Sequence, residues 1–346
     1  TIANDLTIAS SSSLDVSGSN HAIGIKGDFT NSGTFTDQAG TVTFNGTGAQ
    51  SITTGGVGTD NDFNNVTITN TGTLADGSDV QTSDAIKVTG TLDITEGQFM
   101  PATSSDFVNI TLSNSNGKLK PASGSSITVS GTWNNSGGSS SSFDGNSGTV
   151  TFDAGGAQSL TSDGISFYNL STSTGSTDLT IQDALIVAND LTIASSTTLD
   201  AGSNRAISVG GDWSNSGTFT SASNTVTFNG TGAQSVTTGG VGTGNDFNNV
   251  TITNTALSPG DAADVQTADA IKVAGTLDVT DGQFMPATSS DFLDVSVSAS
   301  EGILKLASSS SIIVSGNWSD ASGTFTPNTG SVTMDGSSKT LATGAS

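Results

Sequence analysis

Short segments in which apolar and polar residues alternate recur along the whole chain. Examples are TVTF at Thr41, NVTI at Asn65 and AIKV at Ala85, and such segments begin every 15 to 24 residues. An alternation with a period of two is typical of a β-strand that is buried on one face. The Gly-, Asn- and Ser-rich stretches between the segments predict tight turns. We therefore expect an all-β chain built from about 16 units of roughly 20 residues.

A much longer repeat is superimposed on these short units. Residues 41–70 and 225–254 differ at only two positions, and matching residues are 184 or 185 positions apart from Asn4 onward. Internal repetition of this kind indicates an array of stacked units. We predict one continuous array over residues 1–346, with a first long repeat over 4–188 and a second, incomplete one over 189–346. Both ends fall inside a repeat, so we expect a window of a longer array.

The length of the unit decides between two all-β folds. Strands in a unit of about 20 residues are too short to form a core alone, so the units must stack, as in a parallel β-solenoid. Tandem β-sandwich (Ig-like) domains of about 100 residues are the alternative. A Gly-x-aromatic marker recurs at intervals of 104, 80 and 105 residues, and this uneven spacing favours a solenoid that gains or loses a turn. A right-handed β-helix is expected from the sterics of parallel crossovers.

Three kinds of residue receive structural roles in this solenoid. Apolar strand residues, including the Phe of each TVTF segment, are predicted to fill the interior. Asparagines at corners tolerate left-handed backbone and cap turns. The marker aromatics are predicted to plug a wide turn rather than to bind a ligand. The residues so assigned are Phe29, Phe44, Asn65, Trp133, Phe152, Trp213, Phe228, Asn249 and Trp318.

Composition and charge argue against several classes of function and partner. The chain has 31 acidic residues and 8 Lys and Arg, giving a formal charge of −23, which argues against nucleic acid or an anionic membrane as a partner. It has no cysteine, and therefore no disulfide framework and no thiolate chemistry. No apolar stretch approaches the roughly 20 residues that a membrane helix needs, so we expect no membrane insertion within this segment.

Catalytic constellations are missing from the sequence. The single histidine, His21, is replaced by Arg205 in the second repeat, so neither a Ser-His-Asp nor a Cys-His arrangement recurs. We predict no catalytic residues, no organic cofactor and no enzymatic activity. A carboxylate cluster that acts on polysaccharide is the less favoured alternative.

Calcium is the one metal that the residue types suit, because carboxylate and amide oxygens are abundant in the turns. The candidate ligands are Asp60, Asp62, Asp76, Asp79, Asp246, Asp261 and Asp264. No EF-hand or nonapeptide calcium motif accompanies them. Solvated turn acids are the alternative interpretation of these residues.

Sugar attachment is a further candidate modification. The tripeptide Asn-Gly-Thr places an N-glycosylation sequon at Asn45 and at Asn229. Six more sequons occur, but a chain this rich in Ser and Thr contains many by chance. Glycans are therefore candidate partners.

One recurring string resembles a known class of repeats. GTVTFDAGGAQSL at Gly148–Leu160, followed by FYNL at Phe167–Leu170, is similar to repeats of large secreted bacterial surface and adhesin-type proteins. The resemblance covers essentially the whole chain and implies a β-helical stalk, adhesin shaft or fibre at the cell surface. It brings no catalytic residues. We therefore expect a structural, non-enzymatic segment of an extracellular filament that continues in a longer chain or self-assembles; a glycan- or calcium-binding module is the alternative.

Overall fold

The computed structural model describes residues 1–58, 61–72, 79–137, 142–173, 175, 177–256, 264–320 and 322–344. Within these ranges the chain consists of β-strands and turns, with a single short 3₁₀ helix, η1 (Ser17–Ser19). The strands pair in parallel and form a β-solenoid of about 15 turns. This confirms the predicted fold class, and the parallel pairing excludes tandem antiparallel sandwiches.

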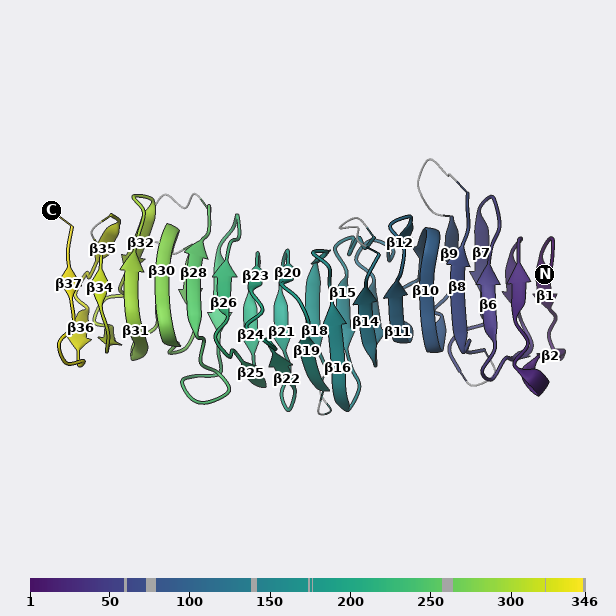
Figure 1. The fold of residues 1–346 in the computed structure, drawn as a ribbon, viewed down its shortest axis with the longest axis horizontal. Helices are drawn as coiled ribbons and strands as arrows, with labels where there is room; N and C mark the ends of the chain where they lie inside the picture. The colour runs from purple at the N-terminus through teal and green to yellow at the C-terminus, as the bar shows by residue number, and fades with distance from the viewer. Residues whose placement is uncertain are drawn as a thin grey trace. The chain divides into compact units, whose positions relative to one another are not determined.

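The chain divides into two compact units, Thr1–Asn169 (unit 1) and Leu170–Ser346 (unit 2). This division falls ahead of the sequence repeat boundary at residues 188/189. In each unit the strands lie side by side, one turn after another (Figure 1).

Unit 1 contains the first seventeen strands, and β18 (Asn169–Thr172) covers the division. Their bounds are β1 (Leu6–Ile8), β2 (Ser13–Asp15), β3 (Ile23–Ile25), β4 (Phe29–Asn31), β5 (Thr34–Thr36), β6 (Thr41–Phe44), β7 (Gln50–Thr53), β8 (Asn65–Thr69), β9 (Val80–Thr82), β10 (Lys87–Met100), β11 (Ser105–Leu112), β12 (Gly117–Leu119), β13 (Ser126–Val129), β14 (Thr132–Asn135), β15 (Thr149–Phe152), β16 (Gly156–Thr161) and β17 (Ser166–Phe167).

Unit 2 repeats this succession of short strands. Their bounds are β19 (Thr177–Ile181), β20 (Leu185–Val187), β21 (Leu191–Ile193), β22 (Thr198–Asp200), β23 (Ile207–Val209), β24 (Trp213–Asn215), β25 (Thr218–Thr220), β26 (Thr225–Phe228), β27 (Gln234–Thr237), β28 (Asn249–Thr253), β29 (Val265–Thr267), β30 (Lys272–Met285), β31 (Ser290–Val297), β32 (Gly302–Lys305), β33 (Ser311–Val314), β34 (Trp318–Ser319), β35 (Thr324–Thr326), β36 (Ser331–Met334) and β37 (Leu341–Ala342).

The alternating pattern determines which side of each strand faces the interior. In β6, Val42 and Phe44 are buried, whereas Thr41 and Thr43 are half-buried on the outer face. Branched and aromatic side chains pack well against the same type of residue on the next turn. The interior is therefore a stack of apolar side chains, one layer per turn.

The two units contain the same interior column. In unit 1 it runs through Val42, Val66, Leu92, Ile110, Trp133 and Leu160, each paired in register with the next. In unit 2 it runs through Val226, Val250, Leu277, Val295 and Trp318, and the exposed Leu341 follows in register on the last turn. Turn length varies within both columns, from 18 residues between Leu92 and Ile110 to 27 between Val250 and Leu277.

Two long strands turn a corner at glycine. β10 and β30 have 14 residues each, and Gly97 and Gly282 lie within them at φ of +80° and +78°. A β-carbon at either position would collide with the carbonyl oxygen of Asn70 or Asn254 on the preceding turn. Glycine is therefore needed both for the left-handed backbone and for the close approach of the two turns.

The aromatic residues of the Gly-x-aromatic marker, Phe29, Trp133, Trp213 and Trp318, are buried and form clusters with neighbouring rings. In unit 1, Phe29 is 5.3 Å from Phe63 and 6.5 Å from Phe44 between ring centroids, and Trp133 is 5.1 Å from Phe167. Phe152 is also fully buried. Edge-to-face packing of such rings adds about 0.5–1.5 kcal/mol per pair beyond the area that they bury.

Unit 2 has the corresponding clusters. Trp213 takes the place of Phe29 and packs on Phe219, Phe228 and Phe247 at centroid distances of 4.9, 6.3 and 5.1 Å. Trp318 is 3% exposed and packs on Phe325 at 4.7 Å. The aromatic residues assigned to the interior from sequence therefore all lie there.

Candidate functional site

Asp and Asn side chains at strand starts in unit 1 join each turn to the next. Asp5 Oδ1 accepts a hydrogen bond of 2.9 Å from the backbone N–H of Asp28, and Asp28 Oδ1 accepts one of 2.8 Å from the N–H of Ser51. Asn65 Oδ1 does the same for the N–H of Thr91 at 3.0 Å. Each side chain thus accepts a hydrogen bond from a backbone N–H on the following turn. The hydrogen bonds between strands do not pair this N–H.

The same hydrogen bonds between successive turns occur in unit 2. Asp190 Oδ1 accepts from the N–H of Asp212, and Asp212 Oδ1 from the N–H of Ser235, both at 2.8 Å. Asn249 Oδ1 accepts from the N–H of Thr276 at 3.0 Å. Asn65 and Asn249, assigned to corners from sequence, therefore link successive turns through their side-chain oxygens.

A buried glutamine in unit 2, Gln234, hydrogen-bonds to the turn before it and to the turn after it. Gln234 Oε1 accepts from the N–H of Gly230 at 2.9 Å and from Asn254 Nδ2 at 2.8 Å. Its Nε2 donates to the carbonyl oxygens of Val209 at 2.9 Å and Gly211 at 2.6 Å. All four hydrogen-bonding positions of the amide are filled, so the side chain is held in one orientation.

Gln50 makes the equivalent set of bonds in unit 1. It accepts from Gly46 N–H and Asn70 Nδ2, and it donates to Ile25 O and Gly27 O. The Gly-x-x-x-Gln spacing at Gly46 and Gln50 carries this geometry in the sequence, and it recurs at Gly230 and Gln234.

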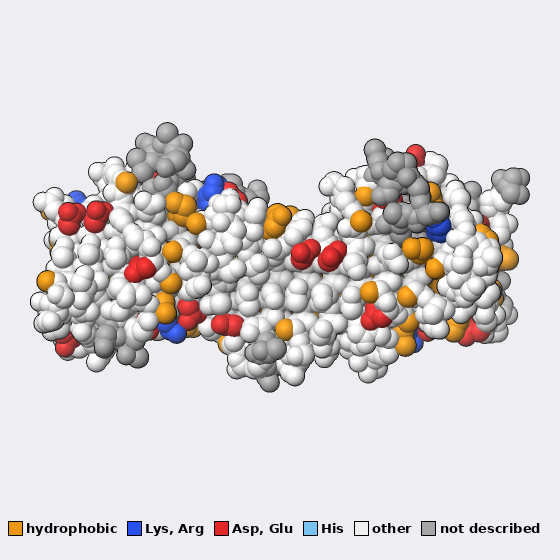
Figure 2. Space-filling view, turned by 180° about the vertical axis from the view of Figure 1, so that it is seen from behind, with side chains coloured by type: hydrophobic (Ala, Val, Ile, Leu, Met, Phe, Trp, Pro, Cys, Tyr) orange, Lys and Arg blue, Asp and Glu red, His pale blue; other side chains and the backbone are white. Residues whose placement is uncertain are grey.

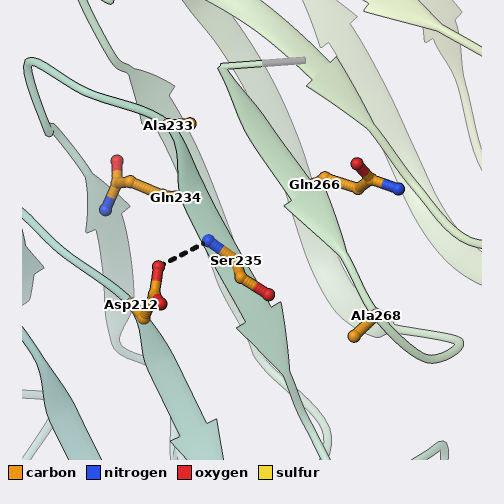
Figure 3. A pocket seen from close by; sticks show the side chains of 6 residues that line it. All are labelled: Asp212, Ala233, Gln234, Ser235, Gln266 and Ala268. Atoms are coloured by element: carbon orange, nitrogen blue, oxygen red, sulfur yellow. Dashed lines mark hydrogen bonds between the residues drawn. The ribbon is translucent and has the colours of Figure 1, made fainter. Parts of the chain in front are cut away.

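An open groove lies on the outer face of unit 2 next to Gln234. It has a volume of about 440 Å³ and is lined by Asp212, Ala233, Gln234, Ser235, Gln266 and Ala268. Asp212, Ser235 and Gln266 stand on three successive turns, because Trp213 pairs with Val236 and Ser235 pairs with Gln266. Figure 3 shows Asp212 turned toward the backbone nitrogen of Ser235.

Unit 1 has the same column with one change. Asp28, Ser51 and Gln81 occupy the three positions, and Ser83 replaces Ala268. The Ser51 and Ser83 hydroxyl oxygens are 3.1 Å apart, so these two groups hydrogen-bond to each other. The corresponding hydroxyl of Ser235 has no such neighbour, because Ala268 has only a methyl group.

A second, smaller groove of about 200 Å³ lies in unit 2 beside an ion pair. It is lined by Lys272, Val273, Ala274, Asp291, Leu293 and Ser315, and Lys272 Nζ is 3.5 Å from Asp291 Oδ2. In unit 1 the matching pair, Lys87 and Asp106, is 2.8 Å apart. The hydrogen bond to Asp106 raises the pKa of Lys87, so this lysine stays charged. Exposed pairs of this kind contribute little to stability.

Asp37 is an ionisable group buried in unit 1. It is 4% exposed, and its Oδ2 accepts a hydrogen bond of 2.8 Å from the N–H of Asn64. Burial raises the pKa of the Asp37 carboxyl from 3.8 to about 6, with a small further contribution from the charge of Asp62. Ser221 occupies this position in unit 2.

We expect Asp37 to make unit 1 less stable as the pH rises. Below about pH 4 the carboxyl is neutral in both the folded and the unfolded chain. Because its folded pKa is the higher one, ionisation between pH 4 and about 6 favours unfolding, by up to roughly 3 kcal/mol. Asp37→Asn should therefore match the wild type at pH 4 and exceed it at pH 7. Denaturant unfolding, with hydrogen exchange to locate the effect in unit 1, measures this; equal stabilities at pH 7 would contradict it.

Four of the seven acidic residues proposed as calcium ligands, Asp62, Asp79, Asp246 and Asp264, lie in the described part of the chain. Asp60, Asp76 and Asp261 lie outside the described residues. Asp62 Oδ1 accepts from the N–H of Gly58, and Asp246 Oδ1 from the N–H of Gly242, both at 2.8 Å, so each closes its own loop.

Asp79 and Asp264 are deeply buried instead, at 5% and 6% exposure. Their Oδ2 atoms accept from the N–H groups of Gln98 and Gln283 at 2.8 Å, and their Oδ1 atoms are buried without a partner. Among the residues that the structure describes, no three Asp, Glu, His or Cys side chains gather as a metal site. Calcium binding stays a prediction.

The two Asn-Gly-Thr sequons differ in accessibility. Asn229 is exposed, whereas Asn45 is half-buried and its Oδ1 has no hydrogen-bond partner. His21 and Arg205, which exchange between the repeats, are both exposed. Figure 2 shows carboxylates, a few cationic groups and hydrophobic side chains scattered over one face of the molecule.

Comparison with known proteins adds no relative. No family model, no curated protein and no solved structure matches the chain. Among the described residues, no helix is long and apolar enough to span a membrane.

Sequence reasoning missed the groove and the two buried glutamines. The identical GAQS strings at Gly48–Ser51 and Gly232–Ser235 were a signal for the glutamines, since a polar residue retained inside an apolar alternation needs a buried partner. The column of Asp212, Ser235 and Gln266 had no such signal, because its members come from turns separated by variable lengths of chain.

Proposed function

We propose that this chain is a structural, non-enzymatic segment of an extracellular filament, stalk or adhesin shaft. Its partners are further turns of the same kind, either in a longer repeat chain or in another copy. Its work is mechanical: each turn transmits load to the next, and the acidic outer surface keeps the filament solvated and separate from anionic surfaces.

The observation that carries this proposal is the double connection between consecutive turns within each unit. Backbone ladders pair the turns in parallel register, as in the pairing of β6 with β8 and of β26 with β28. Side chains such as Asp28 and Asp212 add hydrogen bonds across the same interfaces. A force along the stack is therefore shared among many bonds at each interface, which suits a load-bearing element.

The outer surface supports the same proposal. Outward strand positions carry mainly Thr, Ser, Asn and Asp, and the large exposed apolar side chains of the described residues stand singly, as at Val57 and Tyr168. Scattered apolar residues of this kind are normal on a soluble surface.

A pulling experiment tests the mechanical role. With the chain held between handles at its two ends, we expect unfolding in discrete steps, each releasing a whole number of turns. Each residue released contributes about 3.3–3.6 Å of contour length. Smooth extension without force peaks would contradict a load-bearing role. The same steps should appear at neutral pH with and without a calcium chelator.

Antibody labelling tests the location. An antibody raised against the folded chain should stain intact cells that produce the protein. Staining only after the cells are permeabilised would contradict the extracellular assignment while leaving the mechanical result intact.

A further inference from the structure

The groove in unit 2 presents three outward polar groups on a rigid base. Asp212 Oδ1 is held by the N–H of Ser235, while its Oδ2 has no hydrogen-bond partner among the described residues. The Ser235 hydroxyl and the Gln266 amide also face outward, and both residues are exposed. The base includes Gln234, whose amide is fixed by four hydrogen bonds. Asp212 and the base therefore need little rearrangement to meet a ligand, which favours binding.

The chemistry of the lining selects the class of ligand. No Lys or Arg lines the groove, so it offers no charge for an anion. Its single carboxylate is too few for a divalent cation, which takes six or more oxygens. Its apolar surface is limited to the methyl groups of Ala233 and Ala268, too little to hold an apolar peptide.

A neutral saccharide meets these groups. Its hydroxyls can donate to Asp212 Oδ2 and accept from Gln266 Nε2, and the Ser235 hydroxyl can do either. The two alanine methyls can contact the C–H face of a sugar ring. The column has one polar residue per turn, spaced by about 4.8 Å, which is comparable to the width of one ring.

We propose that this groove is a binding site for a neutral oligosaccharide, with Asp212, Ser235 and Gln266 as the recognition residues. The chain lies across the three turns, with neighbouring sugar units over neighbouring residues. The proposal does not depend on the mechanical role, because a shaft that binds nothing would still bear load.

Unit 1 supplies an internal comparison. Its Ser51 hydroxyl is hydrogen-bonded to that of Ser83 at 3.1 Å, which restricts the directions in which Ser51 can meet a ligand, and Ser83 replaces the methyl group of Ala268. Binding in unit 2 should therefore be tighter than at the equivalent residues of unit 1, and Ala268→Ser should give the unit 2 groove the hydroxyl pair found in unit 1.

The experiment uses the complete chain with hexasaccharides of glucose, mannose, galactose and N-acetylglucosamine as probes. Saturation-transfer NMR detects contact, and titration gives the affinity. We expect at least one probe to bind with a dissociation constant in the millimolar range or below, and Asp212→Asn to weaken it about tenfold, the cost of one hydrogen bond to a charged group. Asp212→Asn keeps an acceptor for Ser235 N–H and so preserves the fold, which circular dichroism checks.

Asp28→Asn in unit 1 is the matched control and should leave the affinity of the tighter site unchanged. Ala268→Ser should weaken it, because the new hydroxyl would pair with that of Ser235 as Ser83 pairs with Ser51. Failure of all four hexasaccharides to bind at millimolar concentration would overturn the proposal. So would binding that survives Asp212→Asn and is lost in Asp28→Asn.

Discussion

Replacing Trp213 by alanine should lower the free energy of unfolding of unit 2 by about 3–5 kcal/mol. The indole is 1% exposed and packs against Phe219, Phe228 and Phe247 at the centre of one aromatic cluster. Its removal leaves a cavity between turns that the backbone ladders hold at fixed spacing. The surrounding side chains can therefore collapse only partly, which places the cost at the high end for an apolar truncation.

Phenylalanine at the same position should behave very differently. The Trp213 indole N–H is buried without a hydrogen-bond partner, which is unfavourable by about 1–3 kcal/mol. Phe29 fills the equivalent place in unit 1 and packs on Phe35, Phe44 and Phe63. Trp213→Phe loses part of the packing but also removes the unpaired donor, so its net effect should be within about 1 kcal/mol of the wild type.

Equilibrium unfolding in guanidinium chloride, with hydrogen exchange to assign the transition to unit 2, measures both variants. Tyr168→Ala is the control, because this residue is 36% exposed and its truncation should cost less. If Trp213→Phe were as damaging as Trp213→Ala, ring volume rather than the unpaired N–H would dominate, and the proposed equivalence with Phe29 would be wrong.

Replacing Gln234 by alanine should be the second large effect, at about 3 kcal/mol or more. The variant would leave the Gly230 N–H without its acceptor and the Gly211 carbonyl oxygen without the Gln234 donor, while Val209 O would keep only its bond from the N–H of Asn229. Asn254 Nδ2 would lose one of its partners as well. Because these groups are largely shielded from water, solvent cannot fully replace the lost hydrogen bonds.

Gln158 offers a matched control for this prediction. It is also buried and follows the same Gly-Ala dipeptide, but its Nε2 makes one hydrogen bond, to Val129 O at 2.7 Å, and its Oε1 has no partner. Gln158→Ala should therefore cost clearly less than Gln234→Ala. Thermal unfolding and denaturant titration report both. Equal losses would mean that side-chain volume, not the four-bond bridge, accounts for the role of Gln234.

The repeats made the fold predictable to an unusual degree. The alternation in segments such as Thr41–Phe44 fixed which residues face inward, since a strand has a period of two and only one face can be buried. Because residues 41–70 and 225–254 are nearly identical, the same side chains are available to pack inside both copies. The interior positions of Phe44 and Phe228 follow from that pattern alone.

The candidate groove could not be predicted in the same way. Asp212, Ser235 and Gln266 meet because the turns between them contain different numbers of residues and still return to the same register. Turn length depends on loops such as the one after Thr237, whose path is set by its glycines and by Asp269, which accepts from the N–H of Thr238 and Gly240. The sequence pattern of the candidate calcium ligands does not contain this register, and the described candidates each accept from a separate backbone N–H.

The sequence by itself therefore determined the class of fold, the repeating unit and the interior residues, because hydrophobic periodicity is a local property of the chain. Only the tertiary structure decided which polar residues are buried, as with Gln234 and Asp37, and which stand together on the outer face. Those arrangements depend on the register between turns, and register is set by packing and hydrogen bonding across neighbouring turns rather than by any one segment.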